Sequence, residues 1–436
     1  MRGRGAKMHF AARQGRLVPI SVRGLNPPPF ARTHGWAAAS ARPAMEEAMK
    51  SLVGVALRAS LAGVGLSAAS ILSMTAAHAT EFHVIKLVSD TGGAAHSDAN
   101  LINPWGLASS PTSPFWVADN GTGVSTLYNT AGQPQSLVVT INPAGAAPTG
   151  LVWNGNNADF KVSEGGKTGS AAFIFAGEEG TISGWSPAVA LGHSVVAVDN
   201  SALGAGAVYK ALAIGDSGGA QFLYASDFRN GMVEQFDSGF HLIRSFSDPS
   251  VAAGYAPFGA QVLNGHLFVT YALQDAAKHD DVGGAGNGYV DEFNLDGTLV
   301  HQLVSKGGQV DSPWGLDIAP SSFGQFAGDL LVGNFGDGTI SAFDLTSGMF
   351  EGKLRGTDGN PIVLGDLWGL LNGNGGKGGD ADKVYFTAGV SDEAHGLFGA
   401  LAAVPEPGSW ALMLCGFAMT GMMIRGQSAR RALPLG

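Results

Sequence analysis

The sequence predicts an all-β domain built from six similar units, and three observations support this prediction. Between residues 80 and 403 the chain is rich in Gly, Asn, Asp, Ser and Thr and has no long stretch of helical periodicity. Short apolar segments recur there about every fifty residues, and several begin with near copies of one Pro-Trp-Gly-Leu motif. Six such units, each with room for three or four short strands, favour a six-bladed β-propeller, whose sheets pack face to face around a central channel.

Each unit is expected to contain a second strand that precedes a polar turn. The candidates are Phe115-Trp116-Val117-Ala118, Phe173-Ile174-Phe175-Ala176, Phe222-Leu223-Tyr224-Ala225, Leu267-Phe268-Val269-Thr270, Leu330-Leu331-Val332-Gly333 and Val384-Tyr385-Phe386-Thr387. A third strand is then expected to end in an aromatic residue, at Tyr128, Trp185, Phe236, Phe293, Phe343 and Phe398. These aromatic residues are separated by 57, 51, 57, 50 and 55 positions, which sets the repeat.

The first strand of each unit is predicted from the repeated motif. It occurs as Asn103-Pro104-Trp105-Gly106-Leu107, Ser312-Pro313-Trp314-Gly315-Leu316 and Leu367-Trp368-Gly369-Leu370, more weakly as Pro257-Phe258-Gly259 and Thr149-Gly150-Leu151, with Ala211-Leu212-Ala213-Ile214 as the equivalent in the third unit. We expect the aromatic residue to wedge between neighbouring blades and the glycine to permit a crowded backbone beside the axis. The motif therefore favours a structural role in the propeller over contact with a ligand.

The sixth unit ends soon after Leu401, too early to supply a full sheet. The segment Phe82-His83-Val84-Ile85-Lys86-Leu87-Val88 is predicted to fill the gap as the outermost strand. This closure would join the two ends of the domain and remove exposed sheet edges.

The N-terminal residues have the pattern of an export signal. Met49-Lys50 opens a basic start, Leu52 to Met74 is largely apolar, and Ala77 and Ala79 form a small-x-small cleavage site. Residues 49–79 are therefore predicted to be a signal peptide removed by signal peptidase. Residues 1–48 are expected to be either a disordered extension or a misassigned start, with translation beginning at Met45 or Met49.

The C-terminal residues have three parts. Pro405, Glu406 and Pro407 precede an apolar run from Gly408 to Ile424, and Arg425, Arg430 and Arg431 follow it. The apolar run is near the lower limit of about 17 residues for a membrane-spanning helix, and the arginines fit the cytoplasmic side. Residues 404–431 resemble a PEP-CTERM sorting signal, which implies recognition by an exosortase and a transient membrane helix. The alternative is an ordinary C-terminal anchor.

The expected mature domain, residues 80–403, is strongly acidic. Of the 25 Lys and Arg residues 13 lie outside it, but only 3 of the 35 Asp and Glu residues do, so its net charge is about −20. Such a field repels nucleic acid and favours cations or neutral polymers, although it also simply aids solubility. The one cysteine, Cys415, lies outside the domain, so a packed core without disulfides must hold the fold.

The turns between second and third strands are expected on one face of the propeller, together with the connections that lead into the next first strand. Their acidic and amide residues are candidates for a rim around the channel: Asp119, Asn120, Glu178, Glu179, Asp227, Asp280, Asp281, Asp337, Asp392 and Glu393. Such oxygens could hold Ca²⁺ or bond sugar hydroxyls. Asp and Asn are also favoured in tight turns for purely structural reasons.

The loop from His279 to Gly288 is the candidate metal site, with Asp280 and Asp281 as ligands and Ca²⁺ as the candidate cofactor. A flexible acidic loop is the alternative. No nucleophile elbow, phosphate-binding loop or His-Glu-x-x-His helix is present, so no catalytic residue is predicted. Enzyme activity remains an open alternative, since a propeller hydrolase such as a lactonase gathers single ligands from different blades.

Three segments carry a family resemblance: residues 101–108, residues 115–123 and residues 395–401. They resemble an uncharacterised bacterial family of exported propeller-like proteins, some with PEP-CTERM tails, and the domain is broadly similar to NHL-repeat propellers. The resemblance implies no activity or catalytic residue. We expect an exported binding module of the cell envelope, surface or extracellular matrix, for polysaccharide or protein and not for nucleic acid. The alternative is a metal-dependent, lactonase-like hydrolase.

Overall fold

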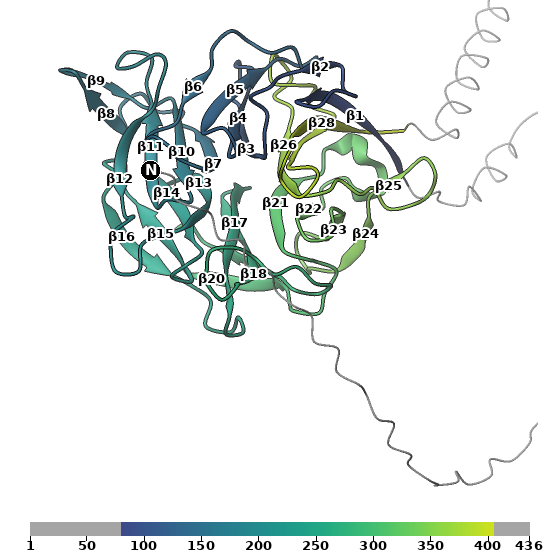
Figure 1. Ribbon diagram of the computed structural model, residues 1–436. Helices are drawn as coiled ribbons and strands as arrows, with labels where there is room; N and C mark the ends of the chain where they lie inside the picture. The colour runs from purple at the N-terminus through teal and green to yellow at the C-terminus, as the bar shows by residue number, and fades with distance from the viewer. Residues whose placement is uncertain (1–79, 405–436) are drawn as a thin grey trace, which may run out of the picture. The chain divides into compact units, whose positions relative to one another are not determined.

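The computed structural model describes residues 80–404 of the chain, and these form a closed ring of six β-sheets (Figure 1). The innermost strand of each sheet lies beside the central axis, and the chain passes round the ring one sheet at a time. These inner strands are β3 (Pro104–Ala108), β7 (Pro148–Trp153), β13 (Tyr209–Ser217), β17 (Tyr255–Leu263), β21 (Pro313–Ile318) and β26 (Leu367–Asn372). The predicted six-bladed propeller and all six first strands are confirmed.

The second strands of the blades also lie where they were predicted. They are β4 (Phe115–Asp119), β10 (Phe173–Gly177), β14 (Ala220–Asp227), β18 (His266–Leu273), β22 (Leu330–Asn334) and β27 (Val384–Ala388). The third strands are β5 (Val124–Tyr128), β11 (Thr181–Trp185), β15 (Met232–Phe236), β19 (Tyr289–Phe293), β23 (Ile340–Phe343) and β28 (Leu397–Ala403). Every neighbouring pair from first to third strand is antiparallel.

The third strand ends in an aromatic residue in five blades, but the prediction for Phe398 was wrong. Val384 at the start of β27 pairs with Leu401, so Leu401 holds the position that Tyr128 and Trp185 hold elsewhere. Phe398 lies near the start of β28 instead. Its ring packs 5.2 Å from that of Phe115 in the first blade, so it serves the contact between blades.

The outermost strands are β6 (Val139–Thr140), β12 (Val195–Asp199), β16 (Leu242–Phe246), β20 (Leu299–Val304), β24 (Phe350–Lys353) and, in the last blade, β1 (Glu81–Ser89). β1 runs antiparallel to β28, from Phe82 opposite Ala403 to Ser89 opposite Leu397. Two short strands, β2 (His96–Ser97) and β25 (Arg355–Gly356), pair with β1 in parallel. The predicted closure of the ring by the N-terminal strand is therefore confirmed.

Two further elements decorate the ring. A hairpin of β8 (Lys161–Glu164) and β9 (Lys167–Ser170) interrupts the second blade between β7 and β10. A 3₁₀ segment, η1 (Ser321–Phe326), follows β21, and its Phe323 packs 4.8 Å from Phe82 of β1. The predicted signal peptide, sorting motif and C-terminal helix lie outside the described residues. Within residues 80–404, no helix is long and apolar enough to cross a membrane.

The crowding expected beside the axis is present, because neighbouring inner strands approach backbone to backbone. A Cβ atom on Gly150 would lie 2.0 Å from the backbone nitrogen of Leu212 in the next blade. One on Gly315 would lie 2.3 Å from the carbonyl oxygen of Trp368. No larger residue fits these places without moving a blade, so the glycine of the repeated motif sets the radius of the ring.

The aromatic residue of the motif lies at the axis and not between blades, which corrects our expectation. Trp105 stacks on Trp368 at 3.5 Å between ring centroids, and Trp314 meets both rings edge-on. The space between blades is filled instead by side chains of the second strands, such as Trp116 stacked on Phe173 at 4.1 Å. The indole rings therefore lie at the axis, at the same end of the channel as the polar turns described next.

Candidate functional site

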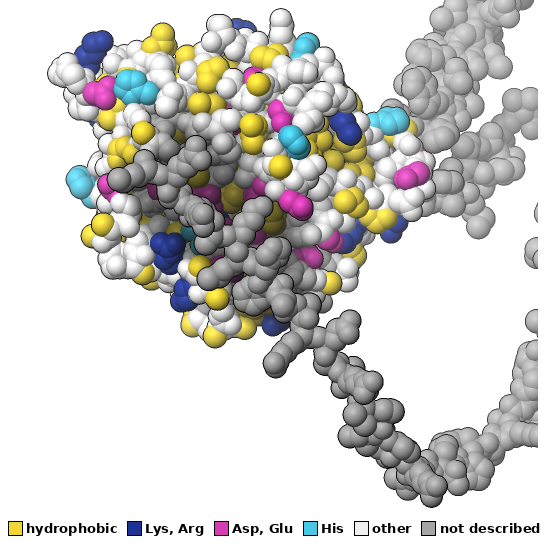
Figure 2. Space-filling model, in the orientation of Figure 1, with side chains coloured by type: hydrophobic (Ala, Val, Ile, Leu, Met, Phe, Trp, Pro, Cys, Tyr) yellow, Lys and Arg dark blue, Asp and Glu magenta, His cyan; other side chains and the backbone are white. Residues whose placement is uncertain are grey.

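A cavity of about 280 Å³ lies at one end of the channel, and we call it the channel mouth. Six of its lining residues carry carboxylate or amide oxygens: Asn103, Asn120, Glu178, Asp280, Asp281 and Glu393. They come from turns between second and third strands or from a connection into an inner strand, as the topology predicts. Figure 2 shows acidic side chains toward the centre of one face of the molecule.

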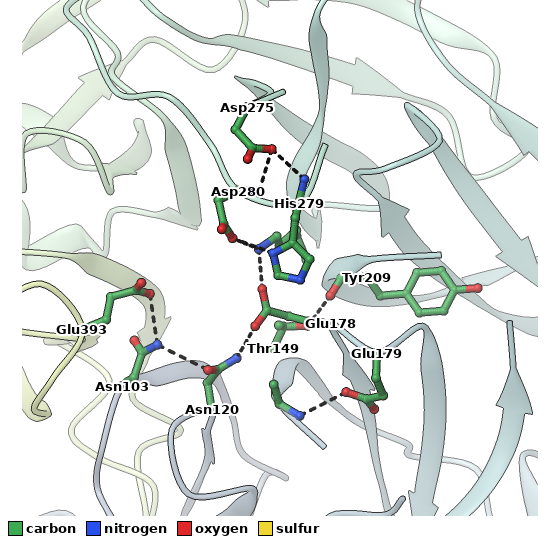
Figure 3. Close-up of polar contacts among 12 residues, drawn as sticks. Asn103, Asn120, Thr149, Glu178, Glu179, Tyr209, Asp275, His279, Asp280 and Glu393 are labelled. Carbon is green, nitrogen blue, oxygen red and sulfur yellow. Dashed lines mark hydrogen bonds and ion pairs between the residues drawn. The ribbon is translucent and has the colours of Figure 1, made fainter. Parts of the chain in front are cut away.

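A row of hydrogen bonds joins three blades across the channel mouth (Figure 3). The amide nitrogen of Asn103 donates to Glu393 at 3.0 Å and lies 3.4 Å from the amide oxygen of Asn120. The amide nitrogen of Asn120 donates to Glu178 at 3.1 Å. The amide oxygen of Asn103 accepts from the indole nitrogen of Trp368 at 3.0 Å, which anchors this carboxyl–amide row to the axial aromatic residues.

Lys210 is the cation of the channel mouth, and only 2% of its side chain is exposed. Its ammonium group pairs with Glu178 and lies 3.2 Å from a carboxylate oxygen of Asp280. The same group lies 5.2 Å from the ring centre of Trp105, a distance at which a cation is attracted by an aromatic face. Lys210 therefore ties the second, third and fourth blades together at the axis.

The loop between β18 and β19 brings Asp280 and His279 to the channel mouth. The ring nitrogen Nδ1 of His279 lies 2.8 Å from Asp280, and the backbone nitrogen of His279 donates to Asp275 at 2.8 Å. Ligand atoms of Glu178, His279 and Asp280 all lie within 4.8 Å of one another. Such a group could hold a metal ion, although the ammonium of Lys210 already contacts two of its three members.

The carboxylates of the channel mouth have pKa values that are shifted in different directions. Burial raises the pKa of Glu393 and of Asp281 above the ordinary value for these groups, more than their hydrogen-bond partners lower it. Burial acts in the same direction on Asp280, but the hydrogen bond from His279 and the charge of Lys210 outweigh it and lower its pKa. Four carboxylates surround one ammonium group, so the channel mouth suits a cationic or hydroxyl-rich ligand better than an anion.

The aromatic lining of the channel mouth consists of Trp105, Phe335 and Trp368. Phe335 is half-buried and stacks on Trp368 at 4.2 Å between ring centroids. The indole nitrogen of Trp105 is buried and has no hydrogen-bond partner among the described residues. Of the three rings, that of Phe335 has an exposed part that a ligand could contact.

Five predicted rim residues do not line the cavity: Asp119, Glu179, Asp227, Asp337 and Asp392. Most of them stabilise their own turn or strand instead. Asp119 is fully buried and accepts from the backbone nitrogen of Thr126 at 3.0 Å. Asp227 accepts from the side chain of Asn230 at 2.7 Å, and Asp337 pairs with Lys353 at 2.8 Å. Asp392 is exposed outside the cavity, whereas its neighbour Glu393 lines it.

The cavity also has lining residues that were not predicted from the sequence: Asn103, Trp105, Lys210, Phe335 and Trp368. Asn103, Trp105 and Trp368 belong to the repeated motif, which was interpreted as architecture. Lys210 had a signal that was overlooked, because a lysine inside an otherwise apolar first strand, Tyr209 to Ile214, has no structural reason to be there.

No family model matches this sequence. The chain is 32% identical over 334 residues to the uncharacterised protein R648 of Acanthamoeba polyphaga mimivirus, which covers 74% of this chain and 80% of that protein. The chain belongs to the same family as R648. A second member, the uncharacterised protein L690 of the same virus, is 30% identical over 319 residues and covers 71% of this chain and 82% of its own length. The family thus extends to viral proteins.

Solved structures are similar to this chain at the level of the propeller. Virginiamycin B lyase from Staphylococcus aureus matches 74% of this chain and all of its own, with a TM-score of 0.45 and 12% identity. The WD40 propeller domain of Doa1 matches 70% of this chain and 94% of its own, with a TM-score of 0.39 and 11% identity. TM-scores and sequence identities this low carry no argument about function, so no activity is assigned to this chain from them.

Proposed function

We propose that the protein is an exported binding module that recognises a polysaccharide through the channel mouth. The carboxyl–amide row of Glu393, Asn103, Asn120 and Glu178 is the observation that carries this proposal. Sugar hydroxyls both donate and accept hydrogen bonds, so they need carboxylate acceptors and amide donors held at fixed positions. The half-buried ring of Phe335 offers an apolar surface beside this row.

The size of the channel mouth favours one sugar unit, such as the end of a chain. Its volume of about 280 Å³ is just below the range of roughly 300–1,000 Å³ that is typical of small-molecule sites. A protein partner would instead need a contact of about 800 Å² on each surface, of which this cavity could form only the centre. A protein is therefore a less favoured ligand than a sugar.

Binding to a glycan array, with and without Ca²⁺, tests the proposal. We expect the Glu178→Gln and Asn120→Ala variants to weaken binding to any glycan found by tenfold or more, about 1.4 kcal/mol, because the first replaces a charged acceptor of the row and the second removes an amide that joins it. Glu179→Gln is the matched control, since Glu179 lies in the same turn but bonds the backbone of Ala147 at 3.0 Å. Absence of glycan binding, or an equal loss in the control, would contradict the proposal.

Export and sorting to the cell surface are part of the proposal, and the sequence of the terminal segments supports them. Signal peptidase and an exosortase would be the partners during export, with residues 404–431 recognised through Pro405, Glu406 and Pro407. In a bacterium that has an exosortase, we expect Glu406→Ala to leave the uncleaved chain in the membrane fraction. Immunoblots of cell fractions measure this, and wild-type and variant chains of equal size and location would refute the sorting role.

A metal-dependent hydrolase is the second candidate, and the grouping of Glu178, His279 and Asp280 favours it. The ammonium of Lys210 competes with a metal ion for two of these residues. We therefore expect calorimetric titration with Ca²⁺ or Mn²⁺ to show tighter binding in Lys210→Met than in the wild-type protein, and none in Asp280→Asn. Circular dichroism controls for folding, because removing Lys210 leaves carboxylates unpaired. A wild-type protein that binds neither ion would eliminate this candidate.

A further inference from the structure

The channel mouth contains more acidic groups than cations. Four carboxylates line it, from Glu178, Asp280, Asp281 and Glu393, but only one ammonium group does, that of Lys210. Lys210 pairs with Glu178 and lies 3.2 Å from Asp280, so these two charges are matched. Within residues 80–404, the half-buried Asp281 and Glu393 form no ion pair with Lys, Arg or His. Two carboxylates of the cavity therefore have no cationic partner in the part of the chain that the structure describes.

The hydrogen-bond donors of the channel mouth are largely used within it, whereas acceptors remain. The amide nitrogen of Asn103 donates to Glu393 and to Asn120. That of Asn120 donates to Glu178, and the indole nitrogen of Trp368 donates to Asn103. Each carboxylate has about four lone-pair sites, so the four carboxylates can accept more hydrogen bonds than they receive. A ligand that fits must therefore supply donors.

Lys210 shows which surroundings the channel mouth gives to an ammonium group. Its nitrogen lies against the carboxylates of Glu178 and Asp280. It also lies 5.2 Å from the ring centre of Trp105 and 6.0 Å from that of Phe228. Carboxylates attract a cation by charge and hydrogen bonding, and aromatic faces attract it through the ring quadrupole. The cavity is thus built from groups that stabilise an ammonium ion.

A second place of this kind lies beside Glu393. Glu393 accepts from Asn103, and Asn103 in turn accepts from the indole nitrogen of Trp368. The half-buried ring of Phe335 stacks on Trp368 at 4.2 Å and lines the same cavity. Burial raises the pKa of Glu393, and the negative charge of Glu178 adds to this effect. A positive charge brought next to Glu393 would therefore be stabilising.

On the basis of the glycan binding proposed above, we propose that the sugar unit in the channel mouth carries a free primary amine, whose ammonium group is attracted by Glu393 and Asp281. An ammonium group supplies three donors, no acceptor and one positive charge, which match the free acceptors and unpaired acids of the cavity. An N-acetylated sugar offers one uncharged amide donor at the same position, and a neutral sugar offers a hydroxyl group. Either of these would leave both carboxylates without a cation.

Calorimetric titration with three disaccharides distinguishes these sugars. The ligands are the β-1,4-linked dimers of glucosamine, N-acetylglucosamine and glucose, which differ only in the group at carbon 2. We expect the glucosamine dimer to bind at least tenfold more tightly than the other two at about pH 6, where an amine keeps its proton and an ordinary carboxyl group is ionised. A salt concentration of about 0.15 M screens attraction to acids more than roughly 8 Å away.

Variants locate the ammonium group. Glu393→Gln and Asp281→Asn should each weaken binding of the glucosamine dimer at least tenfold and leave binding of the glucose dimer within about twofold, because each removes only a charge. Asp392→Asn is the matched control, since Asp392 precedes Glu393 in the same turn but is exposed outside the cavity. This control should bind the glucosamine dimer as the wild-type protein does. Circular dichroism confirms that the variants are folded.

The possible failures are separable. Equal affinity for the three disaccharides would overturn the preference for an amine and leave glycan binding in place. Trilysine, which carries ammonium groups without a sugar ring, should bind at least tenfold more weakly than the glucosamine dimer, and equally tight binding would show recognition of a basic peptide instead. If none of the three disaccharides binds, the preference for an amino sugar is wrong, and the glycan array decides separately whether the channel mouth binds any other glycan.

Discussion

A chain of residues 98–404, which lacks β1 and β2, is expected to lose cooperative folding, whereas residues 80–404 fold. β1 contributes the buried side chains of Phe82 and Val88 to the last blade, and burial of each is worth about 1.5–3 kcal/mol. Its loss also exposes the edge of β28 along seven paired positions. A typical domain is stable by only about 5–15 kcal/mol, so this loss removes much of the total. Thermal unfolding followed by circular dichroism measures it.

A permuted chain separates the closure of the ring from a general loss of residues. Phe82 lies opposite Ala403, and the backbone nitrogen of Val404 donates to Glu81 at 2.8 Å, so β1 could follow β28 as a hairpin. We expect residues 98–404, joined through a short Gly-Ser turn to residues 80–97, to regain the cooperative transition. If the truncated chain unfolds at the same temperature as residues 80–404, the closing strand contributes little and the prediction is wrong.

The closure could be predicted from the sequence because each blade of a propeller needs a similar number of strands. The sixth unit had no residues for a fourth strand after Leu401, and the apolar segment Phe82 to Val88 had no partner elsewhere. The misassigned position of Phe398 has a related cause. β28 pairs with both β27 and β1 and runs from Leu397 to Ala403, so its aromatic residue is not at the end that the spacing indicated.

The site was predicted in part, because topology determines which turns share a face but not which side chains point to the axis. Asn120, Glu178, Asp280 and Asp281 line the channel mouth as predicted. Asp119 and Asp227 come from equivalent turns, yet both are buried and bond the backbone of their own blades. Asp and Asn serve both roles equally well, so the residue type alone could not separate them.

Lys210 could have been singled out as a lysine within an apolar strand, but its partners could not be named from the sequence, because they come from distant positions. Glu178 is 32 residues away and Asp280 is 70 residues away along the chain. The register of β13 brings the ammonium group of Lys210 between two acids and beside the rings of Trp105 and Phe228, and no local motif encodes that arrangement.

Asp291→Asn is expected to stabilise the protein above pH 7 and to make its stability less dependent on pH. Asp291 is completely buried, and neither of its carboxylate oxygens has a hydrogen-bond partner among the described residues. Burial, and next the charge of Asp248, raise the pKa of Asp291 from 3.8 to about 7. A shift of about three units corresponds to roughly 4 kcal/mol between the two protonation states, an upper value for the expected effect.

The direction of the effect follows from proton binding. Because the pKa of Asp291 is higher in the folded than in the unfolded chain, folding takes up a proton between about pH 4 and pH 7. The contribution of this group to stability is therefore full below pH 4 and is lost as the pH rises through 7. Asparagine cannot ionise, so the variant should gain most over the wild-type protein at pH 8 and little or nothing at pH 4.

Denaturant unfolding at pH 4, 6 and 8 measures this difference, because the contributions of carboxylates that do not interact with Asp291 cancel between wild type and variant. Asp248 interacts with Asp291, so the measured difference includes the change in that interaction. Asp382→Asn is the matched control, since Asp382 is exposed and its carboxylate should change stability by less than about 0.5 kcal/mol at any pH. A difference between Asp291→Asn and wild type that stays constant from pH 4 to pH 8 would show that Asp291 does not carry this charge. An unpartnered buried carboxylate would then have to be neutral, or matched by a bound cation, throughout that range.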